Sequence, residues 1–160
     1  MIVVDIQPTY LPSINFDLLD FVRELELAYE NNEEINYFFV GEDLGCDSLD
    51  DMYQFLFELD LREDVMDHID FIEKDYGWIR DAMRELDEEE IIRGLKALIK
   101  DRNLEIKNIN LPCIYEEILC IDRTKNHTII GGGVDECLKE IELTLEAMNI
   151  STTKDHRFIF

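Results

Sequence analysis

Residues 128–138 constrain the fold more than any other part of the chain, because they form a pattern of buried strand, glycine turn and helix start. The β-branched run 128–130 is followed by glycines at 131–133 and then by a helical pattern whose first turn contains Cys137. Glycines permit a sharp turn and a close approach to a ligand, since they tolerate positive φ. We therefore expect a pocket at this turn. The amides of the helix N-terminus would favour the thiolate of Cys137, although a small, buried structural cysteine fits the same pattern.

Strand-like and helix-like segments alternate along the rest of the chain. Short runs rich in β-branched and aromatic residues predict strands, and apolar residues at intervals of three and four predict helices. This alternation predicts an α/β protein with a single domain over residues 1–160, three α/β/α layers and a mostly parallel, Rossmann-like sheet. The predicted strands are 1–6, 35–40, 69–72, 128–130 and 157–160. The predicted helices are 16–31, 48–59, 76–86, 87–100, 115–120 and 134–148, the last with a core stripe of Val134, Leu138, Ile141, Leu145 and Met148.

The segment 103–126 is the least regular, and it is predicted to be a lid or a lateral cover.

The charge of the chain restricts its partners. Its 38 acidic and 15 basic side chains give a net charge of −23, which opposes direct binding to nucleic acid or to an anionic membrane. No basic, apolar leader and no membrane-spanning run is visible, so we expect a soluble, cytoplasmic protein. The four cysteines lack metal or disulfide spacing. A basic protein partner and a homo-oligomer stay open.

Three ionisable residues are predicted to meet at one edge of the sheet. Asp5 and Lys74 follow the first and third predicted strands, and Cys137 follows the glycine turn. In parallel sheets, ligands bind beyond the carboxyl ends of the strands. A carboxylate that takes a proton, a cation that holds a thiolate and a thiol nucleophile suit acyl transfer. Turn capping by Asp5 and solvation of Lys74 are the structural alternatives.

Two segments of the sequence carry recognisable motifs: Asp5-Ile6-Gln7-Pro8-Thr9-Tyr10 and Gly131-Gly132-Gly133-Val134-Asp135-Glu136-Cys137-Leu138. The first resembles the Asp-x-Gln-x-x-aromatic opening, and the second the Gly-x-x-Thr-Asp-x-Cys-Val segment, of the isochorismatase-like cysteine hydrolases, a superfamily that includes nicotinamidases. The resemblance implies hydrolysis of a small amide or related acyl compound, with Cys137 as nucleophile, Asp5 as proton acceptor and Lys74 as its cationic companion. It also implies oxyanion donors at the amides of Val134 and Cys137 and a cis peptide between Gly133 and Val134.

The predicted substrate contacts surround this catalytic set, and we expect no metal or other cofactor. The family's Asp-x-His metal motif has no counterpart, since residues 41–47 contain no histidine, and the motif threonine is Val134. A degenerate, non-catalytic relative therefore stays open. Residues 71–78 and the Gly-Gly-Gly-x-x-Glu-Cys-Leu pattern also resemble small uncharacterised proteins of phage genomes. The predicted substrate-binding residues are Gln7, Tyr10, Trp78, Gly132, Gly133 and Val134.

Two other classes of function compete with the hydrolase. In the first, Asp5, Glu42, Asp43, Asp47 and Asp135 gather at the sheet edge and bind Mg²⁺ for phosphoryl transfer. In the second, the protein binds a basic partner without chemistry, through acids at 43–51 and at 87–90. Solvation of helix faces explains the same acids without a partner.

Overall fold

The fold is built on a five-stranded sheet whose strands are all parallel. The computed structural model describes residues 1–74 and 77–160. The strands lie in the order β3-β2-β1-β4-β5, which confirms the predicted α/β class with its Rossmann-like sheet. Their bounds are β1 Ile2–Val4, β2 Ile35–Val40, β3 Ile69–Lys74, β4 Asn126–Gly131 and β5 Ser151–Lys154.

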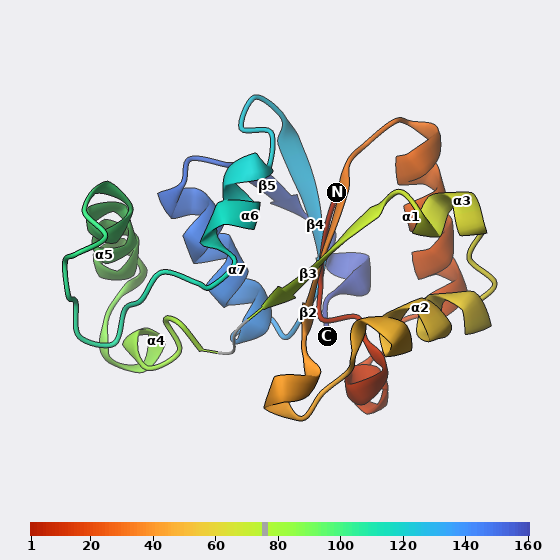
Figure 1. Cartoon of the computed structure of the whole chain (residues 1–160), viewed down its shortest axis with the longest axis horizontal. Coiled ribbons are helices and arrows are strands. Elements are labelled where there is room, and N and C mark those ends of the chain that lie inside the picture. The colour runs from red at the N-terminus through yellow and green to blue at the C-terminus, as the bar shows by residue number, and fades with distance from the viewer. Residues whose placement is uncertain (75–76) are drawn as a thin grey trace.

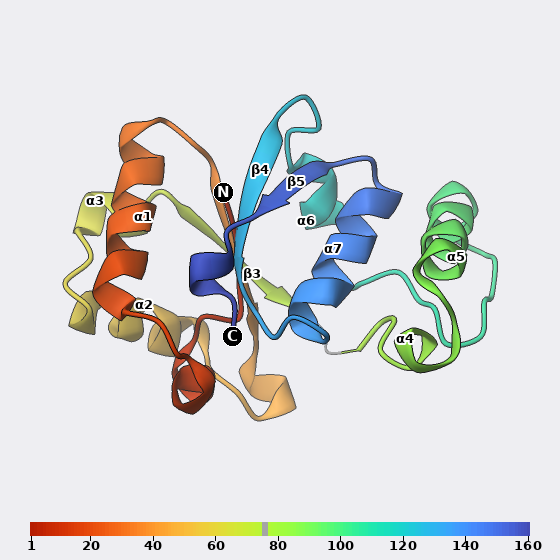
Figure 2. The ribbon, with the colours of Figure 1, turned by 180° about the vertical axis from the view of Figure 1, so that it is seen from behind.

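Helices cover both faces of the sheet (Figures 1 and 2). On one side lie α1 Leu18–Glu30, α2 Leu49–Glu58 and α3 Glu63–Met66; on the other lie α4 Ala82–Glu85, α5 Glu88–Lys100, α6 Tyr115–Cys120 and α7 Cys137–Ala147. Short 3-10 turns occur at η1 Pro8–Ser13, η2 Glu42–Leu44 and η3 His156–Phe158. Helix α5 packs on α7 and lies farther from the sheet than α7 does. Within the described residues, none of the helices combines the length and apolarity needed to cross a membrane.

Two separate apolar cores explain why the strands are apolar on both faces. Ile2 and Val4 of β1 belong to the core on the α7 side, whereas Val3 belongs to the core on the α1 side. Side chains alternate between the faces of a strand, so a central strand covered on both sides needs a continuous apolar run. The same reason accounts for the fully buried β2.

Helix α7 begins later than the sequence pattern predicts. Its first residue is Cys137, and Val134 is 49% exposed in the preceding turn instead of contributing to the core. Glu136 has φ −127° and ψ −107°, which is not helical, and its amide donates to the carbonyl of Gly133. Residues 134–136, which the apolar stripe predicts to be helical, therefore belong to the turn before α7. Leu138, Ile141, Leu145 and Met148 are buried as predicted.

The predicted helix 76–86 is reduced to α4. Tyr76 lies outside the described residues, and residues 77–81 form turns. Their backbone groups bond to other segments instead of to a helix: the Ile79 amide donates to Glu140, and the Trp78 carbonyl accepts from the Asn110 amide. Tertiary hydrogen bonds have replaced the helical ones.

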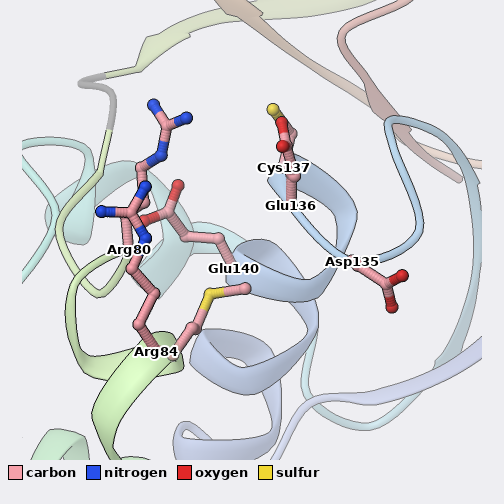
Figure 3. A pocket seen from close by; sticks show the side chains of 7 residues that line it. Arg80, Arg84, Asp135, Glu136, Cys137 and Glu140 are labelled. Carbon is pink, nitrogen blue, oxygen red and sulfur yellow. The ribbon is translucent and has the colours of Figure 1, made fainter.

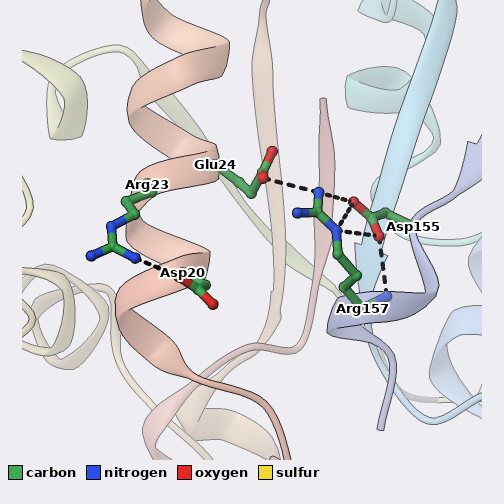
Figure 4. A network of polar contacts seen from close by, with 5 residues as sticks. All are labelled: Asp20, Arg23, Glu24, Asp155 and Arg157. Carbon is green, nitrogen blue, oxygen red and sulfur yellow. Dashed lines mark hydrogen bonds and ion pairs between the residues drawn. The ribbon is translucent and has the colours of Figure 1, made fainter.

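The predicted edge strand 157–160 is also wrong, because β5 lies earlier, at Ser151–Lys154. The Asp155 side chain accepts from the Arg157 amide and begins η3. Arg157 also bonds to Asp155 and to Glu24 of α1 (Figure 4). Phe158 is buried against the α1 side, 5.3 Å from Phe16 between ring centroids. The apolar residues near the end of the chain therefore pack into the core on the α1 side instead of forming a strand beside β4.

The irregular segment 103–126 is a lateral cover, with α6 where the sequence predicts it. Ile109, Ile114 and Ile118 are buried in the core on the α7 side. The amide of Ile109 donates to the carbonyl of Ile106 in a local turn. Burial of three isoleucines holds this segment against α5 and α7, which does not suit a lid.

Candidate active site

A buried ion pair joins the ends of two strands. Asp5 follows β1, and Lys74 is the last residue of β3, on the far side of β2. Lys74 Nζ lies 2.7 Å from Asp5 Oδ2, and the two side chains are 0% and 1% exposed. Removing two charges from water is costly and is offset only by close pairing. The fold thus brings together two of the three predicted catalytic residues.

Asp5 carries two further costs. Its φ is +52°, in the left-handed region, which costs a non-glycine residue about 1 kcal/mol. Its second carboxylate oxygen, Oδ1, is buried and has no hydrogen-bond partner among the described residues. Backbone strain and unsatisfied buried polar atoms are features that cluster at functional sites, and Asp5 has both.

The field of Asp5 also reaches a neighbouring phenol. Burial, and secondarily the negative charge of Asp5, raises the pKa of Tyr37 well above its usual value. The Tyr37 hydroxyl donates to the carbonyl of Ile6. Tyr37 therefore stays neutral beside the carboxylate of Asp5, and its hydroxyl donates its hydrogen bond to the backbone and not to Asp5.

Cys137 is the first residue of α7 and borders a cavity. Cys137 is 8% exposed and packs in the core on the α7 side, yet it also lines a cavity of about 160 Å³ (Figure 3). In general, a helix N-terminus is a position where the helix dipole can lower the pKa of a thiol. The described residues that line the cavity are Arg80, Met83, Arg84, Asp135, Glu136, Cys137 and Glu140.

The glycine turn brings the start of α7 close to β1. Gly131 pairs with Val4 in the sheet, and a Cβ on Gly131 would lie 2.1 Å from the Val4 carbonyl oxygen. Gly131 and Gly132 have φ of +85° and +71°, which only glycine adopts readily. Gly133 is not constrained in this way. The cis peptide implied between Gly133 and Val134 is not formed, since no cis bond occurs in the described part of the chain.

Glu140 is a buried carboxyl group that the sequence did not single out. It lines the cavity three residues after Cys137, on the same side of α7, and is 4% exposed. Its Oε1 accepts from the Ile79 amide at 3.1 Å. Burial raises the pKa of Glu140; the hydrogen bond from the Ile79 amide and, more weakly, the positive charge of Lys74 oppose that rise, and the negative charge of Asp5 adds a smaller increase. Glu140 is thus electrostatically linked to the Asp5–Lys74 pair and spatially linked to Cys137.

The predicted substrate contacts Gln7, Tyr10 and Trp78 are engaged within the protein. Gln7 is fully buried and bonds through Nε2 to the Val40 carbonyl and to Asp47, while its Oε1 accepts from the Val40 amide. Tyr10 lies 3.8 Å from the sulfur of Cys46. Trp78 is 4% exposed and donates from its indole to Thr144 of α7 at 2.9 Å. These contacts fix the loop after β1 against residues 40–47 and fix Trp78 against α7.

The carboxylates expected for a magnesium site do not gather. In the described ranges, no group of three or more His, Cys, Asp or Glu side chains is placed to hold a metal ion. Asp47 instead accepts from Gln7 and from the Thr9 amide, and Asp5 pairs with Lys74. The predicted cluster of Asp5, Glu42, Asp43, Asp47 and Asp135 is therefore not formed.

No protein-family model, curated protein or solved structure matches this chain. The case for a function therefore rests on the geometry of the site.

Proposed function

We propose that the protein is a cysteine-dependent hydrolase of a small amide or related acyl compound, with Cys137 as nucleophile. The observation that carries the proposal is the buried Asp5–Lys74 pair, whose free carboxylate oxygen is unsatisfied among the described residues. A carboxylate oxygen without a donor suits a proton acceptor. The cavity beside Cys137 suits a small substrate.

The strand register supports a common site. Val4 pairs with Gly131, so Asp5 and Gly132 are the next residues beyond two adjacent strand ends. The turn that leads to Cys137 therefore starts beside Asp5. Glu140 adds an independent link, because it lines the cavity with Cys137 while its pKa responds to the charges of both Lys74 and Asp5.

Each residue has a distinct role in the proposed reaction. Asp5 takes the thiol proton of Cys137, and the sulfur attacks the carbonyl carbon of the amide. The carbon–nitrogen bond then breaks, and the amine leaves with the proton from Asp5. Water gives a proton to Asp5 and attacks the thioester, which releases the acid; that proton returns to the sulfur. Lys74 orients Asp5 and stabilises the thiolate, and amides at the start of α7 stabilise the oxyanion.

Release of ammonia from a panel of small primary amides tests this proposal. We expect turnover in the natural protein and none in Cys137→Ser or Asp5→Asn. Alkylation by iodoacetamide separates the roles: Asp5→Asn leaves the Lys74 cation without a carboxylate, so Cys137 should react faster although turnover is lost. If Cys137 reacts no faster than the exposed Cys120 in the natural protein, and no amide is cleaved, the proposal is wrong.

A binding function is the second candidate, favoured by an apolar stripe on α2. Leu49, Tyr53 and Phe57 are 45%, 39% and 60% exposed at intervals of four residues, which places them on one side of the helix. Asp50 and Asp51 of the same helix are exposed, whereas the Asp47 predicted for this face is buried. Binding of a synthetic amphipathic, lysine-rich peptide that is weakened by both Phe57→Ser and added salt would support this function; binding that is unchanged in Phe57→Ser would contradict it.

A further inference from the structure

A second cavity adjoins the cavity beside Cys137. The two have volumes of about 160 Å³ and 230 Å³, and they share two lining residues, Met83 of α4 and Asp135 of the turn before α7. The other residues that line the second cavity belong to the ranges 86–91 and 139–143, so it lies between the start of α5 and α7. The shared walls place the two cavities side by side. A molecule too long for the first cavity therefore has the second one next to it.

The walls of the second cavity that face the protein interior are apolar. Ile91 and Leu143 are each 1% exposed, and Met83 and Leu86 are partly buried against the same core. Met83 borders both cavities, and an unbranched thioether side chain adapts its shape to the group that packs on it. Burial of a hydrocarbon group on such walls is favourable, because it removes apolar surface from water.

The charged residues of the second cavity lie nearer to solvent. Asp135 and Glu88 are exposed, and Lys139 is partly exposed. Lys139 Nζ lies 2.6 Å from Glu88 Oε1, which joins the first turn of α7 to the first turn of α5. An uncharged chain below this ion pair leaves it intact, whereas a charged group would compete with it. The second cavity thus suits a neutral, apolar group.

We propose that the acyl group attacked by Cys137 carries a short aliphatic chain, and that this chain lies in the second cavity. Because Cys137 lines the first cavity, the carbonyl carbon reacts there, and the chain passes Met83 to reach Leu86, Ile91 and Leu143. Each methylene group that leaves water strengthens binding by up to about fourfold. The substrate class is therefore the amides of small aliphatic acids. The inference rests on the hydrolase function and specifies its substrate.

A chain-length series of thiol reagents tests the inference without a known substrate. Methyl and hexyl methanethiosulfonate both react with a thiolate to form a mixed disulfide, while their sulfur–sulfur bond breaks and methanesulfinate leaves. Site-resolved mass spectrometry at low conversion gives the hexyl-to-methyl rate ratio at Cys137 and at the exposed Cys120. We expect the ratio at Cys137 to exceed that at Cys120 by roughly tenfold or more, the effect of about two methylene groups leaving water. The ratio cancels any difference in thiolate fraction between the two cysteines.

Variants of the second cavity locate the preference. Met83→Gln/Leu86→Gln makes its walls polar, and Leu86→Trp keeps them apolar but fills the space; each should lower the Cys137 ratio to near that of Cys120. The matched control is Ile92→Gln/Ile99→Gln, which changes two partly buried α5 residues that pack on the same core outside both cavities and should leave the ratio unchanged.

The outcomes separate this inference from the hydrolase proposal. Equal ratios at the two cysteines, or a Cys137 ratio that neither cavity variant lowers, would overturn the aliphatic chain while leaving the nucleophile in place. A high Cys137 ratio that falls in the cavity variants, together with a methyl reaction no faster than at Cys120, would support the chain cavity and count against the nucleophile. A Cys137 that reacts with neither reagent would overturn both proposals.

Discussion

The Asp5–Lys74 pair should dominate the response of the fold to substitution at the sheet edge. Lys74→Met removes the cation and leaves the carboxylate of Asp5 1% exposed and unpaired. Breaking a buried ion pair in this way costs about 3–5 kcal/mol of unfolding free energy. Asp5→Asn should cost less, because the amide oxygen still accepts from Lys74. Asn also tolerates the left-handed backbone at +52°. Asp5→Ala should lose about 1 kcal/mol more than Asp5→Asn for that conformation.

A double-mutant cycle measured by urea unfolding checks this reasoning. Asp5→Asn/Lys74→Met places two neutral side chains where the ions were, so its loss should be smaller than the sum of the two single losses by about 2 kcal/mol or more. The exposed pair Arg23–Asp20 provides the control, since both of its partners are more than half exposed; its cycle should show coupling below about 1 kcal/mol. Single losses under about 1 kcal/mol at Asp5 and Lys74, or additive losses, would mean that the pair is not held dry as described.

Three further predictions concern the turn, the cavity and the core. Gly131→Ala should unfold the protein or cost more than about 3 kcal/mol, because its Cβ meets the Val4 carbonyl, whereas Gly45→Ala, at a similar positive φ in open space, should cost only about 1–2 kcal/mol by thermal or urea unfolding. Because burial raises the pKa of Glu140 in the folded state, the natural protein should lose stability relative to Glu140→Gln as the pH rises above the usual Glu value of 4.5. A difference in unfolding free energy between the two proteins that stays constant across about pH 4–8 would contradict this. Phe158→Ala should cost about 3–5 kcal/mol if the side chain fills the core, and a loss below about 1 kcal/mol would favour the exposed strand that the sequence suggested.

Much of the scaffold could be predicted because its signals are local. The 35–40 strand and the helix that begins after Asp87 agree with the observed β2 and α5. Both are fixed by patterns within a few residues: a continuous apolar run, and an acid-rich start whose Asp87 and Glu90 form a capping box. Ser48 and Asp51 form the same kind of local capping box at the start of α2, which lies where the sequence predicts the helix 48–59.

The failures arose where distant segments determine the local structure. The amide of Ile79 bonds to Glu140 and the carbonyl of Trp78 bonds to Asn110, so the predicted helix there is not formed. Apolar residues at the chain end predict a strand and a buried core equally well, and Phe158 fills the core. The local sequence pattern does not reveal which distant segments will bond to or pack against these residues.

The candidate site was predictable only in part, for the same reason. The edge of a parallel sheet brings Asp5 and Lys74 together, and this follows from strand order alone. The meeting of Arg80 and Arg84 with Glu140 depends on how residues 80–84 pack against the start of α7. Glu140 had one usable signal, its spacing of three residues from Cys137 within the same predicted helix.

The packing of η3 gives the two faces of the sheet a mechanical connection. Phe158 is anchored among the residues of the α1 side, and two residues later the Phe160 amide donates to the carbonyl of Gly132 at 3.3 Å. Gly132 belongs to the turn that sets the direction of α7 on the opposite face. A displacement of α1 can therefore be transmitted to the sulfur without passing through the strands, so substitutions in the α1 core should alter the reactivity of a cysteine that they never touch.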